Sequence, residues 1–225
     1  SIGSEGSARR RERTTAPEGT RHWTSTRLGF KYEFSGKIYM QNGTDIKNME
    51  FVNKDTIKLD KILNDLDRFV LKFIKILEKH ADYVIVSGYV SILFGRSRAT
   101  EDIDIFIKEL SKAQFDALYN DLKDSGYWCL NAESADEIYS YLQEGLSIRF
   151  ANEGETVPNF EVKFAKKKSA LMAFSDSLAV VMEEGKVKLS SLERQIAYKR
   201  YYLKSDKDLE DAAYIEKLFK ERINL

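Results

Sequence analysis

Two aspartates, Asp102 and Asp104, are the residues whose types and spacing point most directly to chemistry. They alternate with Ile103, Ile105 and Ile107. In a β-strand this spacing sends both carboxylates to one face, with their Cα atoms roughly 6.5–7 Å apart. Paired carboxylates are hard oxygen ligands, and Mg²⁺ takes its remaining ligands from water and substrate phosphates. The pattern predicts a site for Mg²⁺ or Mn²⁺, although a surface strand with its polar residues in water gives the same alternation.

A small-residue turn just upstream has the features of a phosphate site. The apolar run Tyr83–Val86 predicts a strand that ends at Ser87 and Gly88, and residues 89–94 predict a short helix. Such a turn offers backbone N–H groups, a hydroxyl and close approach to the backbone. We expect Ser87 and Gly88 to hold phosphates, with a purely conformational role for Gly88 as the alternative.

A third acid, Glu161, lies in a second strand-like segment, residues 160–164. Its aromatic and Val residues share one face, so that Glu161 and Lys163 share the other. If this strand lies beside the aspartate strand, Glu161 completes a site with three carboxylates. If it does not, both side chains simply face water.

The elements that must position these residues alternate along the chain. An amphipathic pattern over residues 59–80 predicts a long helix packed behind the catalytic sheet. Further strands are expected at residues 30–34, 37–40, 49–52, 127–130, 146–151, 178–182 and 186–189, and further helices at 111–125, 134–143, 169–174, 191–200 and from 205 onward. This order predicts an α/β (α+β) fold with a mixed sheet flanked by helices and a helical C-terminal part.

The motifs together resemble those of a known superfamily. Gly88, Gly95, Arg98-Ala-Thr and Asp102-Ile-Asp104 are similar to the Gly…Gly…Arg-x-Thr-x-Asp-Ile-Asp pattern of minimal, AbiEii-like nucleotidyltransferases, relatives of DNA polymerase beta. Tyr89 departs from it, because the superfamily usually has Gly or Ser there. The resemblance implies a nucleotidyltransferase-like fold and transfer of a nucleoside monophosphate from an NTP, with ATP among the candidates, to an acceptor hydroxyl. It also implies that Asp102 and Asp104 bind the metal, with the third acid carried to Glu161.

The resemblance continues near the C-terminus. Residues 195–199 and 207–211 look like the paired Lys and (Lys/Arg)-Asp-x-x-Asp motifs of the AbiEii-like group. This implies that Lys199 contacts the triphosphate and that Asp208 and Asp211 orient this lysine or close the site. Acids in the first turn of a helix also stabilise its dipole whatever the function, which is the alternative for both aspartates.

Basic and aromatic residues add further candidates. Arg96 and Arg98 precede the aspartates and could pair with phosphate oxygens, although basic loop residues are most often solvated. Tyr198, Tyr201 and Tyr202 lie among Lys and Arg and could stack on a base, but aromatic residues at helical spacing more often pack against a neighbour.

Composition limits the class of protein. The 225 residues are 43% hydrophobic and 32% charged, enough for a substantial core, and Lys+Arg and Asp+Glu both total 36, so no global charge attracts nucleic acid or anionic membrane. One cysteine and two histidines offer neither an internal disulfide nor a convincing zinc site. No apolar run approaches the roughly 20 residues of a membrane span. We therefore expect a cytoplasmic protein with no membrane partner.

The chain divides into four segments by pattern. Residues 1–28 predict a flexible basic tail or a cloning remnant, 29–80 an N-terminal hairpin and helix, 81–165 the catalytic core, and 166–225 a hairpin and helices that close the nucleotide site.

Two functions from different classes follow. The first is a metal-dependent nucleotidyltransferase whose acceptor is RNA, tRNA or protein, as in toxin–antitoxin systems. The second is a catalytically degenerate module that binds a partner protein, such as the antitoxin-like member of a pair.

Overall fold

The computed structural model describes residues 24–25, 30–32, 37–40, 45–220 and 222–223. Their strands are β1 (Thr24–Ser25), β2 (Phe30–Tyr32), β3 (Lys37–Met40), β4 (Ile46–Asn53), β5 (Thr56–Lys61), β6 (Tyr83–Val86), β7 (Asp102–Ile107), β8 (Tyr127–Cys129), β9 (Ile148–Asn152), β10 (Asn159–Phe164), β11 (Leu178–Met182) and β12 (Gly185–Leu189). Of the predicted 1–28 tail, only β1 lies within the described residues.

Seven α-helices and one π-helix are described alongside the strands. They are α1 (Asp65–Leu77), α2 (Gly88–Leu93), α3 (Lys112–Asp124), α4 (Ala135–Gln143), α5 (Lys168–Ser175), α6 (Leu192–Tyr198), the π-helix η1 (Lys199–Leu203) and α7 (Asp206–Leu218). Across the described residues, none of these helices is long and apolar enough to span a membrane.

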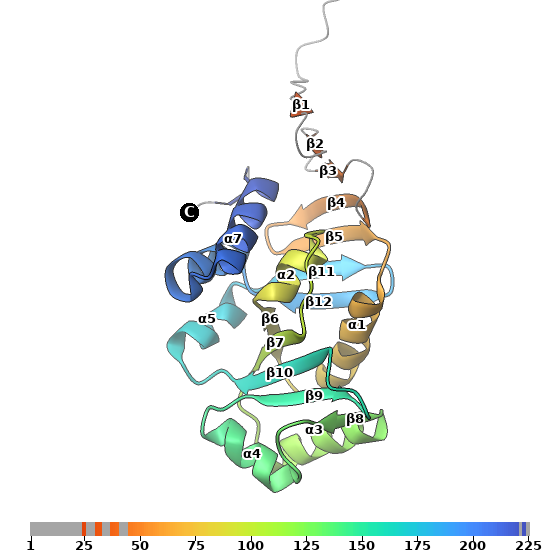
Figure 1. Ribbon diagram of the computed structural model, residues 1–225, viewed down its shortest axis with the longest axis vertical. Coiled ribbons are helices and arrows are strands. Elements are labelled where there is room, and N and C mark those ends of the chain that lie inside the picture. Colours follow the sequence, from red (N-terminus) through yellow and green to blue (C-terminus); the bar gives the residue numbers. More distant parts are fainter. Residues whose placement is uncertain (1–23, 26–29, 33–36, 41–44, 221, 224–225) are drawn as a thin grey trace, which may run out of the picture.

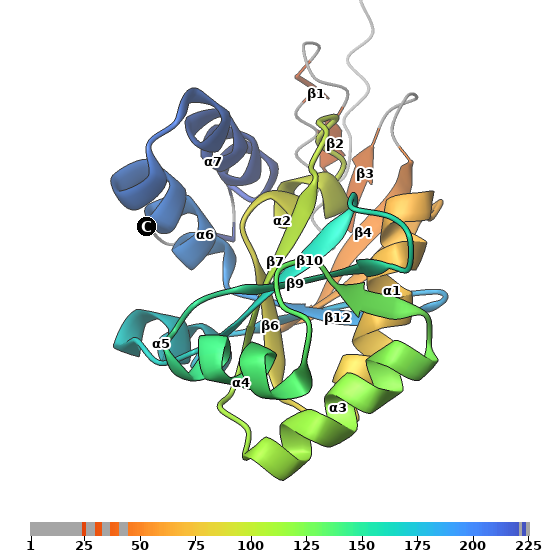
Figure 2. The same ribbon diagram turned by 60° about the horizontal axis from the view of Figure 1, so that its bottom comes forward.

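The strands join in one mixed sheet with the order β1-β2-β3-β4-β5-β11-β12-β6-β7-β10-β9-β8. Most pairs are antiparallel, but β5–β11, β12–β6 and β7–β10 are parallel. Helix α1 lies on one side of the sheet, and α6 and α7 lie on the other (Figures 1 and 2). The predicted α/β fold with a mixed sheet and a helical C-terminal part is confirmed.

The centre of the sheet brings the predicted acidic strands together. Strand β7 lies between β6 and β10, and Asp104 is in register with Val86 on one side and Glu161 on the other. Asp102 is in register with Asn159 at the start of β10. The condition for the role of Glu161, that its strand lies beside the aspartate strand, is therefore met.

Helix α1 covers the apolar face of these strands. Ile103, Ile105 and Ile107 are buried on this face, and Phe73 of α1 stacks on Phe160 of β10 with ring centroids 3.8 Å apart. The helix begins with a capping box between Asn64 and Asp67. The expected position of this helix behind the sheet is confirmed, and the opposite face of β7 and β10 is left to the acids.

The predicted start of this helix at residue 59 is wrong. Residues 56–61 form β5, in which Ile57, Leu59 and Lys61 point inward and the alternate residues outward. A period of two governs this segment because it pairs with β4 and β11.

Tyr89, the residue that departs from the superfamily pattern, points into the core. Its side chain is fully buried, and its hydroxyl donates to Asp67 at 3.0 Å. The buried Lys61 ammonium lies 2.8 Å from the same carboxylate. Tyr89 therefore presents no side chain to the Ser87–Gly88 turn.

Candidate active site

Asp102 and Asp104 share the face of β7 that α1 does not cover. Both are half-buried, while the isoleucines between and beyond them are buried, as the predicted alternation requires. Glu161 and Lys163 of β10 are half-buried in the same way, and register places Glu161 beside Asp104. The sheet thus brings three carboxylates and one ammonium to a single face.

The electrostatics of Asp104 show how closely its carboxylate is crowded. Burial and the charges of Asp102 and Glu161 raise the pKa of Asp104 to about 6, against smaller opposing effects from the Ser87 hydrogen bond and the Lys163 charge. A divalent cation would relieve this repulsion, and carboxylate oxygens are the ligands that Mg²⁺ and Mn²⁺ prefer. The donor set of Asp102 and Asp104 therefore fits the predicted metal.

Glu161 is beside this pair but is held by a basic residue. Arg149 faces it across the β9–β10 ladder, and the guanidinium lies 3.1 Å from the carboxylate. Among the residues that the structure describes, no three His, Cys, Asp or Glu side chains are grouped so as to hold a metal ion. Glu161 thus shares the acidic face and is paired with Arg149, and its role as a third metal ligand stays a prediction.

The Ser87–Gly88 turn connects β6 to the C-terminal helices. Ser87 has a φ of 68° and a ψ of −135°, and its backbone N–H donates to the Gln195 side chain at 3.1 Å. A Cβ at Gly88 would lie 2.8 Å from the Arg98 guanidinium, so any larger residue would displace that group from its present position. The turn holds Arg98 and Gln195, and the N–H group of Ser87 expected to face a phosphate is engaged by Gln195.

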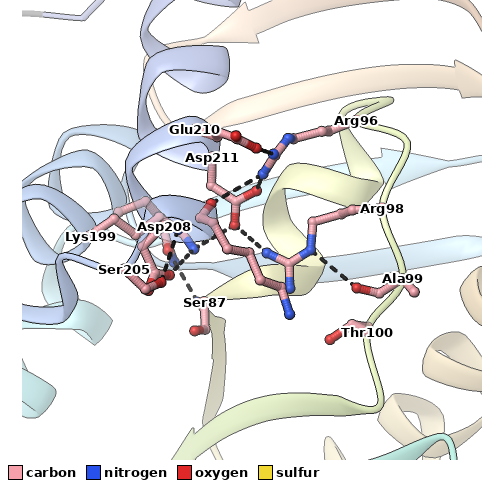
Figure 3. A network of polar contacts seen from close by, with 12 residues as sticks. Ser87, Arg96, Arg98, Ala99, Thr100, Lys199, Ser205, Asp208, Glu210 and Asp211 are labelled. Carbon is pink, nitrogen blue, oxygen red and sulfur yellow. Dashed lines mark hydrogen bonds and ion pairs between the residues drawn. The ribbon is translucent and has the colours of Figure 1, made fainter.

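Three cations converge on one buried carboxylate, that of Asp211 in α7 (Figure 3). Asp211 accepts from Arg96, from Arg98 at 2.5 Å and from Lys199 at 2.8 Å. Arg96 also donates to Glu210 at 2.5 Å. The two arginines that the sequence left between a phosphate role and solvation are in fact ion-paired to α7.

Lys199 lies at the centre of this network. Its buried ammonium donates to Asp208 at 3.2 Å as well as to Asp211, and Asp208 also receives the Ser205 hydroxyl. Burial lowers the pKa of Lys199, and the Asp208 contact opposes the shift. Both aspartates therefore contact the lysine that they were expected to orient.

Arg98 links this network to the acidic face. Burial and the Arg96 charge lower the pKa of Arg98, while the charges of Asp208, Asp102 and Asp104 act in the opposite direction. The guanidinium thus lies within electrostatic reach of both β7 aspartates. Ser87, below the network in Figure 3, directly follows β6, and its side chain hydrogen-bonds to Asp104.

Sequence reasoning missed two residues of this region. Gln195 is buried and hydrogen-bonds to both Ser87 and Ser190, yet the motif at residues 195–199 pointed only to Lys199. Arg149 carries no sequence signal, since its contact with Glu161 depends on how β9 pairs with β10.

Comparison with known proteins gives a distant structural likeness. No family model matches the chain, and no curated protein matches it. A solved structure that does match is the crystal structure of an antigenic nucleotidyltransferase-like protein from Paracoccidioides brasiliensis. Its TM-score is 0.42 at 19% sequence identity, over 67% of this chain and 72% of that chain. A likeness this distant leaves the reaction to be inferred from the site itself.

Proposed function

We propose that this protein is a metal-dependent nucleotidyltransferase, which transfers a nucleoside monophosphate from an NTP to an acceptor hydroxyl and releases pyrophosphate. The observation that carries the proposal is the convergence of a carboxylate pair, Asp102 and Asp104, with the partly buried Arg98 and the buried Lys199. Acids for a metal and fixed cations for phosphates are the two requirements of phosphoryl transfer. The resemblance of the motifs to the nucleotidyltransferase superfamily, AbiEii-like group, supports the same conclusion.

Each residue has a role in this proposal. Asp102 and Asp104 would hold Mg²⁺ or Mn²⁺, which would supply positive charge to offset that of the triphosphate during phosphoryl transfer. Arg98 and Lys199 contact phosphate oxygens, with Arg96 behind them, and Asp208 and Asp211 keep these cations in place.

The acceptor hydroxyl needs a group to receive its proton. Glu161 is in register with Asp104 and carries this role, as the third acid of the face. Ser87 and Gly88 seat the phosphates at the end of β6.

Isothermal titration of Mg·ATP and Mg·GTP tests the proposal directly. The wild type should bind at least one of them, and the Asp102→Ala/Asp104→Ala variant should lose at least tenfold in affinity, or about 1.4 kcal/mol. Asp124→Ala, at an exposed acid at the end of α3, is the matched control and should bind like the wild type. Equal affinity of the wild type and the double variant for Mg·ATP and Mg·GTP would show that Asp102 and Asp104 do not form a metal–nucleotide site.

One observation favours a second function, a catalytically degenerate module that binds a partner protein. Glu161 is engaged by Arg149, and Arg96 and Arg98 are engaged by Asp211, so these three charged groups of the site already have partners. Incubation with labelled NTP and either total RNA or protein separates the two functions, because a binding module labels nothing with any metal. Toxicity on expression that Asp104→Ala abolishes would favour the transferase acting on RNA, tRNA or protein.

A further inference from the structure

Three tyrosines are exposed together where α6 passes into η1. We call Tyr198, Tyr201 and Tyr202 the tyrosine cluster. Their relative exposures are 45%, 75% and 70%, whereas most other aromatic residues of the described chain are buried in the core or packed against it. Water contact on this scale costs free energy for each ring unless something covers it. The cluster is therefore a surface that the fold does not itself use.

Two of these rings already form a stack. The Tyr198 and Tyr202 ring centroids are 4.9 Å apart, and the ring planes differ by 17°. A parallel aromatic pair on the surface presents a flat face on which a third planar ring can stack. Nucleobases are such rings, and stacking on an aromatic side chain is tolerant of base identity.

The backbone holds this surface in a specific place. Residues 199–203 form a π-helix, and Lys204 closes it in the left-handed conformation with a φ of 61°. Such π-helical turns are rare and concentrate at functional sites. The turn buries Lys199 within the ionic network and leaves Tyr198, its neighbour in the chain, at the surface.

The tyrosine cluster adjoins the candidate active site. Burial raises the pKa of Tyr198, and the charges of Tyr202, Asp104 and Asp208 add to the rise. The Tyr198 hydroxyl is therefore within electrostatic reach of an aspartate from each half of the site. A chain that stacks on these rings can extend toward the metal carboxylates.

The charges around the cluster suit phosphates. Lys204 and Lys207 are exposed, and within the described residues neither ammonium has an ion-pair partner. The exposed Asp206 lies between them, whereas Asp208 is taken up by Lys199. Two free lysines beside flat aromatic rings combine backbone attraction with base stacking, the two features of binding to unpaired nucleotides.

We propose that the tyrosine cluster, with Lys204 and Lys207, binds unpaired nucleotides of a single-stranded nucleic acid and presents its end as the acceptor. The role of this nucleic acid as an acceptor rests on the proposed transferase function. Its binding to the tyrosine cluster is inferred from the exposed rings and lysines alone. Bases stack on the Tyr198–Tyr202 pair, Tyr201 covers the next base, and the two lysines contact the connecting phosphates.

Fluorescence anisotropy tests binding without metal or NTP. The probes are labelled RNA and DNA single strands of about 12 nucleotides, within the usual site sizes, and a duplex of the same sequence. We expect the wild type to prefer a single strand to the duplex, and the RNA and DNA probes identify which one is the acceptor class. Tyr202→Ala should raise the Kd about 5- to 100-fold, whereas Tyr202→Phe, which keeps the ring, should stay within about twofold. Lys204→Gln/Lys207→Gln should reduce the slope of log Kd against log salt by about 1.4.

Trp128→Ala is the matched control, since this side chain is 41% exposed on β8 at the far edge of the sheet. Its Kd should equal that of the wild type. Mg·ATP titration of Tyr202→Ala separates the two proposals, because its nucleotide affinity should be unchanged even if RNA or DNA binding is lost. Three results would overturn the inference: wild-type affinity in Tyr202→Ala, a loss of Mg·ATP affinity there, or self-association of the wild type that Tyr202→Ala abolishes.

Discussion

At the scale of single residues, Asp104 carries the clearest conflict between stability and function. Its pKa rises from the ordinary value of 3.8 to about 6, so the folded state binds the proton more tightly than the unfolded state. The ionised carboxylate therefore destabilises the fold above about pH 6, and this penalty disappears below about pH 4. We expect Asp104→Asn to increase the free energy of unfolding by about 1–3 kcal/mol at pH 7 and to have little effect near pH 4.

Urea unfolding at several pH values measures this effect. Asp206→Asn, which changes an exposed carboxylate in the first turn of α7, is the control and should show no gain. A loss of stability in Asp104→Asn at pH 7 would mean that the charge of Asp104 has a compensating partner. Added Mg²⁺ should stabilise the wild type and not the variant, since only the wild type keeps both carboxylates.

Asp211 is the residue on which the ionic network depends. Its buried carboxylate faces Arg96, Arg98 and Lys199, so Asp211→Ala leaves two partly buried guanidinium groups and one buried ammonium without it. We expect a loss of about 3–5 kcal/mol in the free energy of unfolding, the usual result of breaking a buried ion pair. Thermal or urea unfolding measures it.

Glu210 provides the contrast for this experiment. It contacts Arg96 as well, but its side chain is 69% exposed. Glu210→Ala should change the stability by less than about 1 kcal/mol, because solvent screens an exposed pair. Similar losses from the two variants would show that burial of Asp211 does not govern the network.

At the scale of elements, Tyr89 joins α2 to the start of α1. Its hydroxyl donates to Asp67, which also closes the α1 capping box and faces Lys61. Tyr89→Phe removes one buried hydrogen bond and should cost about 1–2 kcal/mol of stability. Because the ring points away from the Ser87–Gly88 turn, nucleotide affinity should not change.

Urea unfolding and Mg·ATP titration of the same variant check both halves of this prediction. Tyr201→Phe, at a 75% exposed ring, is the control and should keep the wild-type stability. If Tyr89→Phe stays folded but loses nucleotide binding, Tyr89 contributes to the turn after all, and its difference from the superfamily pattern becomes functional.

Local signals predicted most elements because their causes are local. Ser111, Ser134 and Ser205 each accept a hydrogen bond from a backbone N–H three residues later, and each helix begins directly after the residue at which the sequence predicted its start. The strand containing Asp102 and Asp104 followed from its alternation alone. The exception is residues 59–61, where apolar spacing fits a helix as well as a strand and only pairing with β4 and β11 decides.

At the scale of the whole molecule, the sequence predicted which residues form the site better than how they contact one another. The adjacency of β7 and β10 was stated as a condition, and strand order fulfils it. The ion pair of Glu161 with Arg149 and the paired state of Arg96 and Arg98 could not be predicted, because each joins segments whose proximity depends on the complete fold. The position of residues 178–189 within the sheet also carries no local signal.

The position of residues 178–189 in the sheet predicts how a shortened chain behaves. Strands β11 and β12 lie between β5 and β6, so the segment after residue 165 supplies the centre of the sheet as well as the helices beside the site. A fragment of residues 45–165 leaves β5 and β6 without these neighbours, and exposed strand edges pair with other chains. We expect this fragment to aggregate or to lack a cooperative urea transition.

The control cuts the chain within the exposed β9–β10 turn at Gly154, which keeps every strand when both pieces are produced together. These paired fragments should assemble and unfold cooperatively, and residues 166–225 supplied in trans should restore the 45–165 fragment. A 45–165 fragment that folds alone would make the predicted core of residues 81–165 independent of the C-terminal segment. Lys199 and Asp211 would then belong to a unit that folds separately from Asp104. Because β11 and β12 lie within the sheet, we expect instead that both residues approach Asp104 only in the complete fold.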